Sequence, residues 1–323
     1  MKLLVTGGAG FIGSNFVRRV SEGYFSDITS VKVLDKLTYA GIRSNLSSIK
    51  KEFDFEFIQG DICDSRSMNS LVGLVDGIVN FAAESHVDRS IFGAEDFVQT
   101  NIIGVQVLLD AIKASGKDIR FLQVSTDEVY GSIESGSWTE DWPLQPNSPY
   151  SASKASGELL ARSYNSTHGM DVVITRCSNN YGTHHFPEKL IPLFITNLIE
   201  GKKVPIYGTG ENIRDWLHVD DHCRGIYSVL MNGRSGEVYN IGGGRELTNN
   251  EITRIILEAM HADEASIEYV EDRKGHDLRY SVDWAKINRE LGYEPQVKFE
   301  DGLKETIQWY RDNESWWKPL KNR

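Results

Sequence analysis

The segment Lys2-Leu-Leu-Val-Thr-Gly-Gly-Ala-Gly-Phe-Ile-Gly-Ser14 carries the main fold signal of this chain. Its apolar run is typical of a buried strand, and we expect a helix after it that reaches about Glu22. Gly7, Gly10 and Gly13 permit a tight turn and let backbone N–H groups approach a pyrophosphate, which a helix N-terminus also favours electrostatically. The segment therefore predicts a dinucleotide site at the first strand-to-helix turn.

A second strand, Val31-Lys-Val-Leu-Asp35, ends in a carboxylate 22 residues after Gly13. Dinucleotide-binding folds place a ribose-binding acid at this position. Because Asp35 would repel a 2′-phosphate, the sequence favours NAD over NADP. The alternative for the glycines is an ordinary strand-to-helix turn, and the register of strand, helix and acid argues against it.

Further strand-like runs alternate with helical patterns, which predicts a parallel sheet with helices on both faces. These runs cover residues 55–58, 77–82, 119–125 and 171–176. The expected fold is a Rossmann-like doubly wound sheet with a smaller, mixed α/β C-terminal substrate domain. We expect the NAD domain to comprise 1–178 and 219–242, and the substrate domain to comprise 179–218 and 243–323.

Composition limits the possible partners. A net charge of -11 over 323 residues argues against a nucleic acid or an anionic membrane surface. The three cysteines, Cys63, Cys177 and Cys223, are widely spaced, which favours a reducing compartment over a disulfide framework or a zinc cluster. No apolar run reaches the roughly 20 residues of a membrane span, and no signal peptide is evident. We therefore expect a cytoplasmic protein that binds small molecules.

The run Phe121-Leu-Gln-Val-Ser-Thr-Asp-Glu-Val-Tyr-Gly131 is the second informative segment. It is typical of a buried parallel strand whose carboxyl end opens toward a ligand crevice. Thr126, Asp127 and Glu128 would lie at that end. Alternatively, the two carboxylates could be an ordinary acidic cluster at a helix N-terminus, without a catalytic role.

Tyr150 and Lys154 are four residues apart in a predicted helix that begins at Ser148-Pro149, a suitable N-cap and first-turn pair. An ammonium beside a phenol favours the phenolate, so we expect the pKa of Tyr150 to fall toward that of a working general base. A helix-surface pair is the alternative. Together with Thr126 and the two carboxylates, the pair favours catalysis.

Two further patterns leave questions for the structure. Residues 95–115 predict one long helix with an apolar side, which would form either a dimer face or intramolecular core. The histidines of His218-Val-Asp-Asp-His222 and the adjacent His184-His185 could suggest a metal, but we predict none, since adjacent side chains rarely point to one ion.

Taken together, the motifs resemble the dTDP-glucose 4,6-dehydratases of the extended short-chain dehydrogenase/reductase superfamily. The resemblance runs from Lys2 to Trp317, and Thr126-Asp127-Glu128 with the Arg-Lys-Gly-His segment is its most specific part. It rests on Gly7-x-x-Gly-x-x-Gly13, Ser125-Thr-Asp-Glu-Val-Tyr-Gly131, Tyr150-x-x-x-Lys154, Arg176-Cys-Ser-Asn-Asn-Tyr-Gly182, Pro187-Glu-Lys-Leu-Ile-Pro192 and Asp272-Arg-Lys-Gly-His-Asp277.

The resemblance implies a mechanism. Tyr150, held by Lys154 and helped by Thr126, takes the proton of the sugar C4 hydroxyl while hydride passes to tightly bound NAD. Glu128 then removes the C5 proton and protonated Asp127 donates to the departing C6 hydroxyl. Hydride returns to C6, so NAD is regenerated in each turnover.

The resemblance also implies two binding sets. The cofactor set is Gly7, Gly10, Phe11, Ile12, Gly13, Asp35, Lys36, Thr38, Asp61, Ile62, Phe81, Ala82, Ala83, Asn101, Tyr150, Lys154 and Asn180. The substrate set is Ser85, Thr126, Asn179, Glu188, Lys189, Leu190, Pro205, Tyr207, Arg214, Asn249, Arg273 and His276. A homodimer is expected.

This chain departs from the resembled family at Gly182-Thr-His-His185, where Gly-Pro-Tyr-Gln is usual, so the local loop shape is open. The activity also has alternatives. A 4-epimerase or a UDP-glucuronate decarboxylase would share Tyr150, Lys154 and the glycines, and a non-catalytic NAD-binding redox sensor is the alternative of another class.

Overall fold

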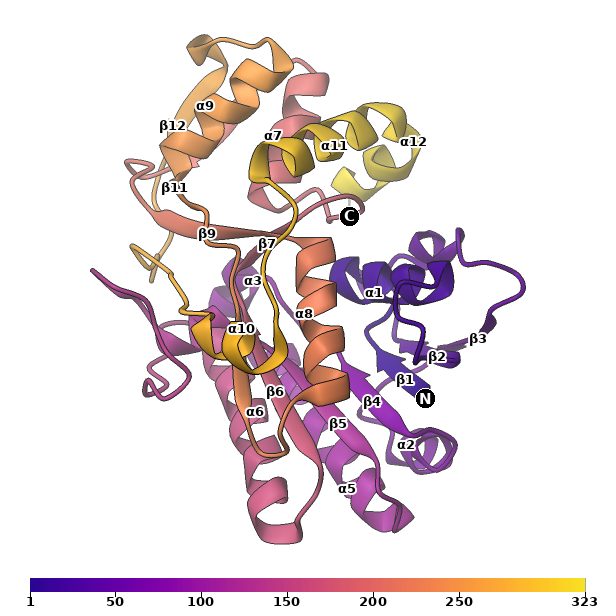
Figure 1. Ribbon diagram of the computed structural model, residues 1–323. Helices are drawn as coiled ribbons and strands as arrows, with labels where there is room; N and C mark the ends of the chain where they lie inside the picture. The colour runs from indigo at the N-terminus through magenta and orange to yellow at the C-terminus, as the bar shows by residue number, and fades with distance from the viewer. Residues whose placement is uncertain (323) are drawn as a thin grey trace.

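A seven-stranded parallel sheet forms the larger part of the computed structural model, which describes residues 1–322 (Figure 1). The strand order is β10-β6-β5-β4-β1-β2-β3. Because β1 lies between β2 and β4, the chain reverses direction across the sheet there, and ligands bind at the carboxyl ends of strands at such a point. The strands are β1 (Lys2–Thr6), β2 (Ser30–Asp35), β3 (Asp54–Gln59), β4 (Gly77–Asn80), β5 (Arg120–Thr126), β6 (Val172–Cys177) and β10 (Val238–Ile241).

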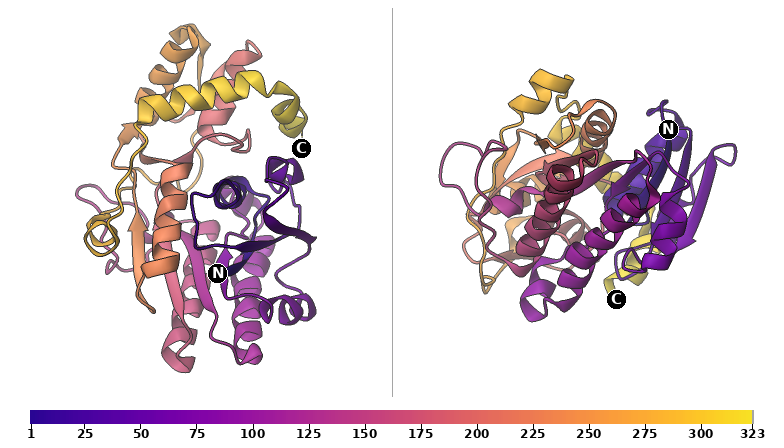
Figure 2. Two further views of the ribbon diagram at one scale, coloured as in Figure 1. Left: turned by 45° about the vertical axis from the view of Figure 1, so that its right-hand side comes forward. Right: turned by 90° about the horizontal axis from the view of Figure 1, so that it is seen from below.

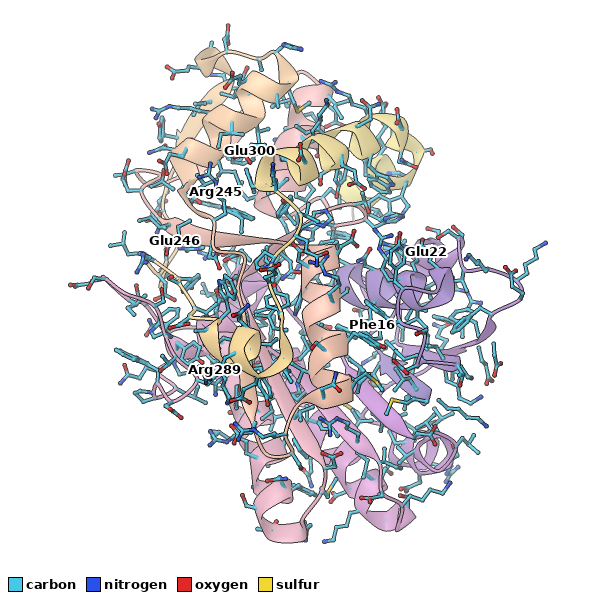
Figure 3. The ribbon with its side chains drawn as sticks, in the orientation of Figure 1. Phe16, Glu22, Arg245, Glu246, Arg289 and Glu300 are labelled. Carbon is cyan, nitrogen blue, oxygen red and sulfur yellow. The ribbon has the colours of Figure 1, made fainter. Side chains whose placement is uncertain are left out.

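Helices cover both faces of this sheet, so its strands are buried on both sides. On one face, Phe16 of α1 and Ile226 of α8 share a core cluster with Val31 of β2 (Figure 3). On the other face, Leu108 of α5 packs with Ile78 of β4. The covering helices are α1 (Phe11–Glu22), α8 (Val219–Asn232), α10 (Ala285–Leu291), α2 (Ser65–Val72), α5 (Val105–Ser115) and α6 (Pro149–His168).

A second, smaller region lies over the carboxyl end of the sheet (Figure 1). It has a three-stranded sheet of order β11-β9-β7, a parallel pair of β12 and β8, and its own apolar core. Arg245 and Glu300 form an ion pair of 3.2 Å that ties β11 to α11 (Figure 3). Its elements are β7 (Asn179–Tyr181), α7 (Leu190–Ile199), β8 (Val204–Tyr207), β9 (Ile213–His218), β11 (Glu246–Thr248), α9 (Asn249–Met260), β12 (Ile267–Val270), α11 (Phe299–Asp312) and α12 (Glu314–Trp317).

These two regions confirm the predicted fold class. The chain crosses between them more than once, because α8 and β10 return to the large sheet after β9. The remaining short elements are α3 (Val87–Phe92), α4 (Glu95–Val98) and the helical turns Arg43–Leu46, Gln99–Gly104, Asp127–Tyr130, Glu264–Ser266 and Lys318–Asn322. Within residues 1–322, the helices all lack the length or the apolar character needed to cross a bilayer.

Several predicted elements differ in the structure. The helix expected over residues 95–115 contains a π-helical turn at Gln99–Gly104. The strand expected over 77–82 ends at Asn80. The apolar side of α5 is intramolecular core, because Leu108, Leu109 and Ile112 are buried against the sheet.

Candidate active site

One cavity opens at the carboxyl ends of β1, β2, β4, β5 and β6, and it gathers most of the predicted residues. Of the predicted cofactor set, all members except Asn101 line it. The lining also includes the predicted catalytic residues Thr126, Asp127, Glu128, Tyr150 and Lys154. The structure thus brings the glycine turn and the acid/base residues to opposite ends of one space.

The glycine turn is shaped for close approach to a ligand. Gly7 has φ +67°, and a Cβ there would lie 2.5 Å from the Ala82 backbone nitrogen, so a side chain does not fit. Helix α1 begins next to the cavity, with Gly10 as its N-cap. Among the residues that the structure describes, no side chain caps this helix, and its first turn contains no acidic residue. Its free backbone N–H groups and helix dipole therefore suit a pyrophosphate.

Asp35 is fixed at the end of β2. Its carboxylate accepts hydrogen bonds from the backbone N–H groups of Ala9 and Leu37, both at 2.8 Å. Burial raises its pKa, and these two bonds partly offset that effect. Beyond β3, Asp61 pairs with Lys36 at 2.8 Å. A buried carboxylate at this end of the cavity fits the hydroxyls of an adenosine ribose, so the residues present fit NAD.

Asn101 does not line the cavity, but it holds a segment that does. Its amide donates to the Glu84 carbonyl at 3.0 Å and to Ser153 Oγ at 2.8 Å, and its Oδ1 accepts from the Glu84 N–H. These bonds occupy the side chain, so the structure gives Asn101 a role in holding the segment after β4. The prediction of a direct cofactor contact finds no support in this geometry.

Sequence patterns gave no signal for several lining residues. Tyr39, Ala40 and Gly41 come from the loop after β2, His185 and Phe186 come from the loop before α7, and Thr100, Cys177 and Ser178 complete this group. Tyr39 and Phe186 meet edge to face with ring centroids 5.4 Å apart. Such loops have no hydrophobic period, and only the tertiary fold brings them together.

At the chemical end, the end of β5 sets Thr126 and the carboxylates in place. Thr126 Oγ1 accepts from the Glu128 N–H at 3.3 Å, which caps the turn Asp127–Tyr130, and donates to Asp127 Oδ1 at 3.1 Å. Burial raises the pKa of Asp127 well above its ordinary value, and the charge of Glu128 raises it further. This environment favours a protonated Asp127.

Glu128 has different surroundings. Burial raises its pKa above the ordinary value, and the nearby cations Arg273, Lys189 and Arg214 offset part of that rise. Asp127 has Glu128 as its largest charged neighbour, whereas Glu128 has three cations. The two adjacent carboxyl groups therefore suit opposite protonation states, an acid and a base.

Tyr150 and Lys154 lie side by side on α6, which begins as predicted with a Ser148 capping box. The expected lowering of the Tyr150 pKa is wrong for this structure. Burial raises that pKa well above its ordinary value, and the charge of Glu128 adds to the effect. Lys154 Nζ donates to the Val124 carbonyl at 2.7 Å, and burial lowers its pKa to about 8. Desolvation of the phenol and the nearby carboxylate charge thus set the direction of this shift.

The substrate set divides into two groups. Ser85, Asn179, Glu188 and Lys189 line the cavity, and Lys189 Nζ donates to the Ser85 carbonyl at 3.1 Å. Thr126 lines the cavity as well. The other predicted residues lie outside its lining, on α7, β8, β9, α9 and the segment after β12; they are Leu190, Pro205, Tyr207, Arg214, Asn249, Arg273 and His276. Tyr207 and His276 are ring neighbours, with centroids 6.4 Å apart.

The histidine pairs are held by protein contacts. His218 caps α8, since its Nδ1 accepts from the Asp220 N–H at 3.3 Å, and His222 bonds to Asn180 at 2.9 Å. His184 has φ +64° and packs on Trp309 at 4.3 Å, which turns His185 to stack on Phe11 at 4.1 Å. Over residues 1–322, no group of three or more His, Cys, Asp or Glu residues is arranged to hold a metal.

Comparison with known proteins agrees with this geometry. Residues 4–306 match the family model described as GDP-mannose 4,6 dehydratase. A dTDP-glucose 4,6-dehydratase from an Actinoplanes species is 57% identical, over 98% of this chain and 100% of the relative. Two solved structures are also similar. One, a dTDP-glucose 4,6-dehydratase from Streptomyces venezuelae with NAD and TYD bound, has a TM-score of 0.97 and 58% identity, over 99% of this chain and 100% of that chain.

The other is a dTDP-glucose 4,6-dehydratase from Bacillus anthracis in complex with NAD. It has a TM-score of 0.92 and 48% identity, and the match covers 99% of each chain. These relatives match the chain over nearly its whole length, and the two solved structures share its fold. The chain therefore belongs to the dTDP-glucose 4,6-dehydratase family of NAD-dependent hydro-lyases.

Proposed function

We propose that this chain converts dTDP-glucose into dTDP-4-keto-6-deoxyglucose, with NAD regenerated in each turnover. The observation that carries this proposal is the adjacent pair of Asp127, which is buried, and Glu128, which is half-buried, in the cavity that Tyr150 also lines, with unlike surroundings for the two carboxyl groups. An acid and a base poised together are what elimination of water across two neighbouring carbons requires.

Oxidation at C4 comes first. Tyr150 Oη takes the proton of the C4 hydroxyl, and Thr126 Oγ1 holds that hydroxyl in line. Lys154 lies one helical turn away on α6 and supplies positive charge that favours the phenolate once the sugar hydroxyl is engaged. NAD, when bound, supplies the hydride acceptor for C4 and the hydride donor for C6.

Elimination follows because the 4-ketone acidifies the C5 proton. Glu128 takes this proton, and the C–O bond at C6 breaks as Asp127 gives its proton to the leaving hydroxyl, so that water departs. Hydride addition at C6 and delivery of a proton to C5 from Glu128, after that proton has exchanged with solvent, complete the product. Sugar and cofactor together undergo no net change in oxidation state.

Binding roles are assigned to the remaining predicted residues. Asn180 faces the nicotinamide, and Ser85 and Asn179 face the glucose. Residues Glu188, Lys189, Leu190, Pro205 and Tyr207 border the nucleotide, while Arg214, Asn249, Arg273 and His276 serve the phosphates and their ribose. The placement of Arg273, Lys189 and Arg214 around Glu128 supports this assignment, because a diphosphate needs several cations near the reacting sugar.

The larger organisation is also a proposal. We divide the chain into an NAD domain of 1–178 and 219–242 and a substrate domain of 179–218 and 243–323, and the pairing of β10 with β6 supports the return of 219–242 to the large sheet. Within 243–323, α10 packs on α8 and β10 and therefore belongs with the NAD domain. Exposed apolar side chains of the α3 to α6 region support a homodimer; they are Phe92, Val98, Ile103 and Leu159. The three free cysteines support a cytoplasmic enzyme.

Incubation with dTDP-glucose in deuterated solvent tests the reaction. We expect one solvent deuterium at C5 and loss of the C6 hydroxyl, measured by NMR and mass spectrometry, and slower turnover with UDP-glucose. Recovery of a galactose configuration would indicate an epimerase. Release of carbon dioxide from UDP-glucuronate would indicate a decarboxylase, and inertness toward every nucleotide hexose would revive the redox sensor.

A further inference from the structure

His222 is a buried imidazole that the proposed mechanism does not use. It lies on α8, is 0% exposed, and its Nδ1 is 2.9 Å from Asn180 Oδ1. Burial lowers its pKa to about 3, so the ring is neutral and carries one N–H. Asn180, its partner on β7, lines the same cavity as Tyr150 and Lys154. His222 thus stands directly behind the wall of the active site.

The hydrogen bonds around Asn180 fix the orientation of its amide. Asn180 Nδ2 donates to the Ser178 carbonyl at 2.9 Å. The reversed amide would place two acceptor oxygens against each other at that distance, so Oδ1 must face His222. The imidazole therefore donates from Nδ1, and the second hydrogen of the Asn180 amide stays free on a side chain that lines the cavity.

Apart from the hydrogen bond to Asn180, an apolar side chain could replace the packing that the His222 ring provides. Its Nε2 is buried and has no hydrogen-bond partner among residues 1–322, which costs stability. An apolar residue of similar volume would avoid that cost while filling the same space. The bond to Asn180 is the one polar contact that sets histidine apart from such a residue at this position.

We infer that His222 is a positioning residue that holds the Asn180 amide with its free N–H directed at an acceptor oxygen of the cofactor, the carboxamide oxygen of the nicotinamide. This inference rests on the proposed placement of the nicotinamide at Asn180. A fixed donor there sets the rotation of the nicotinamide ring, and with it the alignment for hydride transfer at C4.

Two matched substitutions test the inference. In His222→Asn the side-chain amide nitrogen lies where Nδ1 lies and keeps the bond to Asn180, whereas in His222→Gln the amide lies at the level of Nε2 and loses it. We expect NAD affinity near that of the wild type for His222→Asn and a roughly two- to tenfold weaker affinity for His222→Gln, the effect of one neutral hydrogen bond. Titration of the NAD-free protein with NAD and the single-turnover rate of C4 oxidation measure both.

Thermal unfolding separates positioning from packing. Asparagine is smaller than histidine and leaves space, so His222→Asn should melt at a lower temperature than His222→Gln, while it binds NAD more tightly. If His222 had only a structural role, the variant with the lower melting temperature would also have the weaker NAD affinity. His218→Gln is the control, because His218 is a buried histidine at the start of the same helix and lies outside the cavity lining; its NAD affinity should stay at the wild-type value.

Asn180→Ala separates failure of this inference from failure of the proposed function. We expect Asn180→Ala to weaken NAD binding, and His222→Gln to add nothing in that background. If Asn180→Ala weakens binding but His222→Gln does not, or if His222→Asn is as defective as His222→Gln, the inference is overturned. If Asn180→Ala leaves NAD affinity unchanged, the proposed placement of the nicotinamide at Asn180 is wrong, and the inference about His222 is wrong with it. The deuterium experiment tests the dehydration itself.

Discussion

The two ends of this active site are built in different ways. The cofactor end is formed by the carboxyl ends of neighbouring parallel strands, and its groups are mainly fixed backbone N–H groups and one anchored carboxylate, Asp35. The substrate end joins segments from Ser85 to His276, and its charged groups are long side chains such as Lys189 and Arg273. We therefore expect changes at the cofactor end to affect NAD retention and changes at the substrate end to affect substrate affinity. Changes at the catalytic residues, where the two ends meet, should affect turnover.

Tyr150→Phe should have the largest effect, because it removes the base where the two ends meet. We expect kcat to fall by about 10³-fold or more, in the range of general acid–base contributions. Formation of NADH absorbance in a single turnover should fall by the same factor. Since the phenyl ring keeps the edge-to-face contact with Phe97, the local packing of α6 should be retained. NADH appearing at a normal rate would contradict the assignment of Tyr150.

Asp127→Asn should come next, with a loss of about 10²-fold in kcat. The amide cannot give a proton to the C6 hydroxyl, but oxidation at C4 survives. NADH absorbance should therefore accumulate in this variant, which it does not in Tyr150→Phe. The Thr126 hydroxyl, now bonded to Asp127, can donate equally to the amide oxygen, so the local fold is kept. Unchanged turnover would remove Asp127 from its role.

Arg273→Gln is expected to weaken substrate binding, because Arg273 lies at the substrate end. Hydrogen bonds to charged groups contribute about 1.5–3 kcal/mol, which corresponds to a roughly 10- to 100-fold higher KM for dTDP-glucose. NAD affinity should not change. Arg254→Gln is a matched control, because Arg254 is exposed and pairs only loosely with Glu264 at 3.7 Å. Equal effects of the two variants on KM would contradict the placement of the diphosphate at Arg273.

The pH profile reports on Lys154. Burial lowers its pKa to about 8, so its charged form is present below that pH and is lost as the pH rises. We expect kcat/KM to be halved near pH 8 and to fall about tenfold per further unit. Asp127 must be protonated to act, so loss of its proton would also lower kcat/KM at high pH. If Lys154 causes the fall above pH 8, this alkaline limb of the profile should persist in Asp127→Asn. A profile flat to pH 10, or loss of the limb in that variant, would contradict the assignment to Lys154.

The contrast between the two ends also explains what sequence patterns could predict. Gly7, Asp35 and Tyr150 belong to motifs in which a strand or helix period places each residue within one or two elements. Tyr39 and Phe186 line the same cavity, but they come from loops that meet only in the folded chain. Residue contacts of that kind depend on packing between distant segments, which no local period encodes.

The same limit applies to electrostatics and helix geometry. The pKa of Tyr150 rises because of burial and the charge of Glu128, a residue of a different segment, whereas sequence spacing pointed only to Lys154. The π-helical turn at Gln99–Gly104 contains Asn101, whose side chain bonds to Glu84 and Ser153. Turns of this type are rare and frequently lie at functional sites, and the apolar period of residues 95–115 did not indicate one.

Trp316→Phe should have the smallest effect and tests whether the ends are mechanically joined. The C-terminal helices reach back toward the cofactor end (Figure 2), where Trp316 Nε1 donates to Asn45 Oδ1 at 3.0 Å. Asn45 Nδ2 in turn donates to the Ala9 carbonyl at 3.0 Å, next to the N–H that holds Asp35. Phenylalanine keeps most of the packing and removes only the first bond.

We expect the free energy of unfolding in urea to fall by about 1 kcal/mol, the contribution of one hydrogen bond, and the release of NAD to become a few times faster. Trp142→Phe is the control, since Trp142 is 44% exposed and should change neither quantity. A higher KM for dTDP-glucose with unchanged NAD release would show that this connection supports the substrate end instead. Faster NAD release with unchanged KM would mean that the C-terminal segment, although part of the substrate region, helps to retain the cofactor.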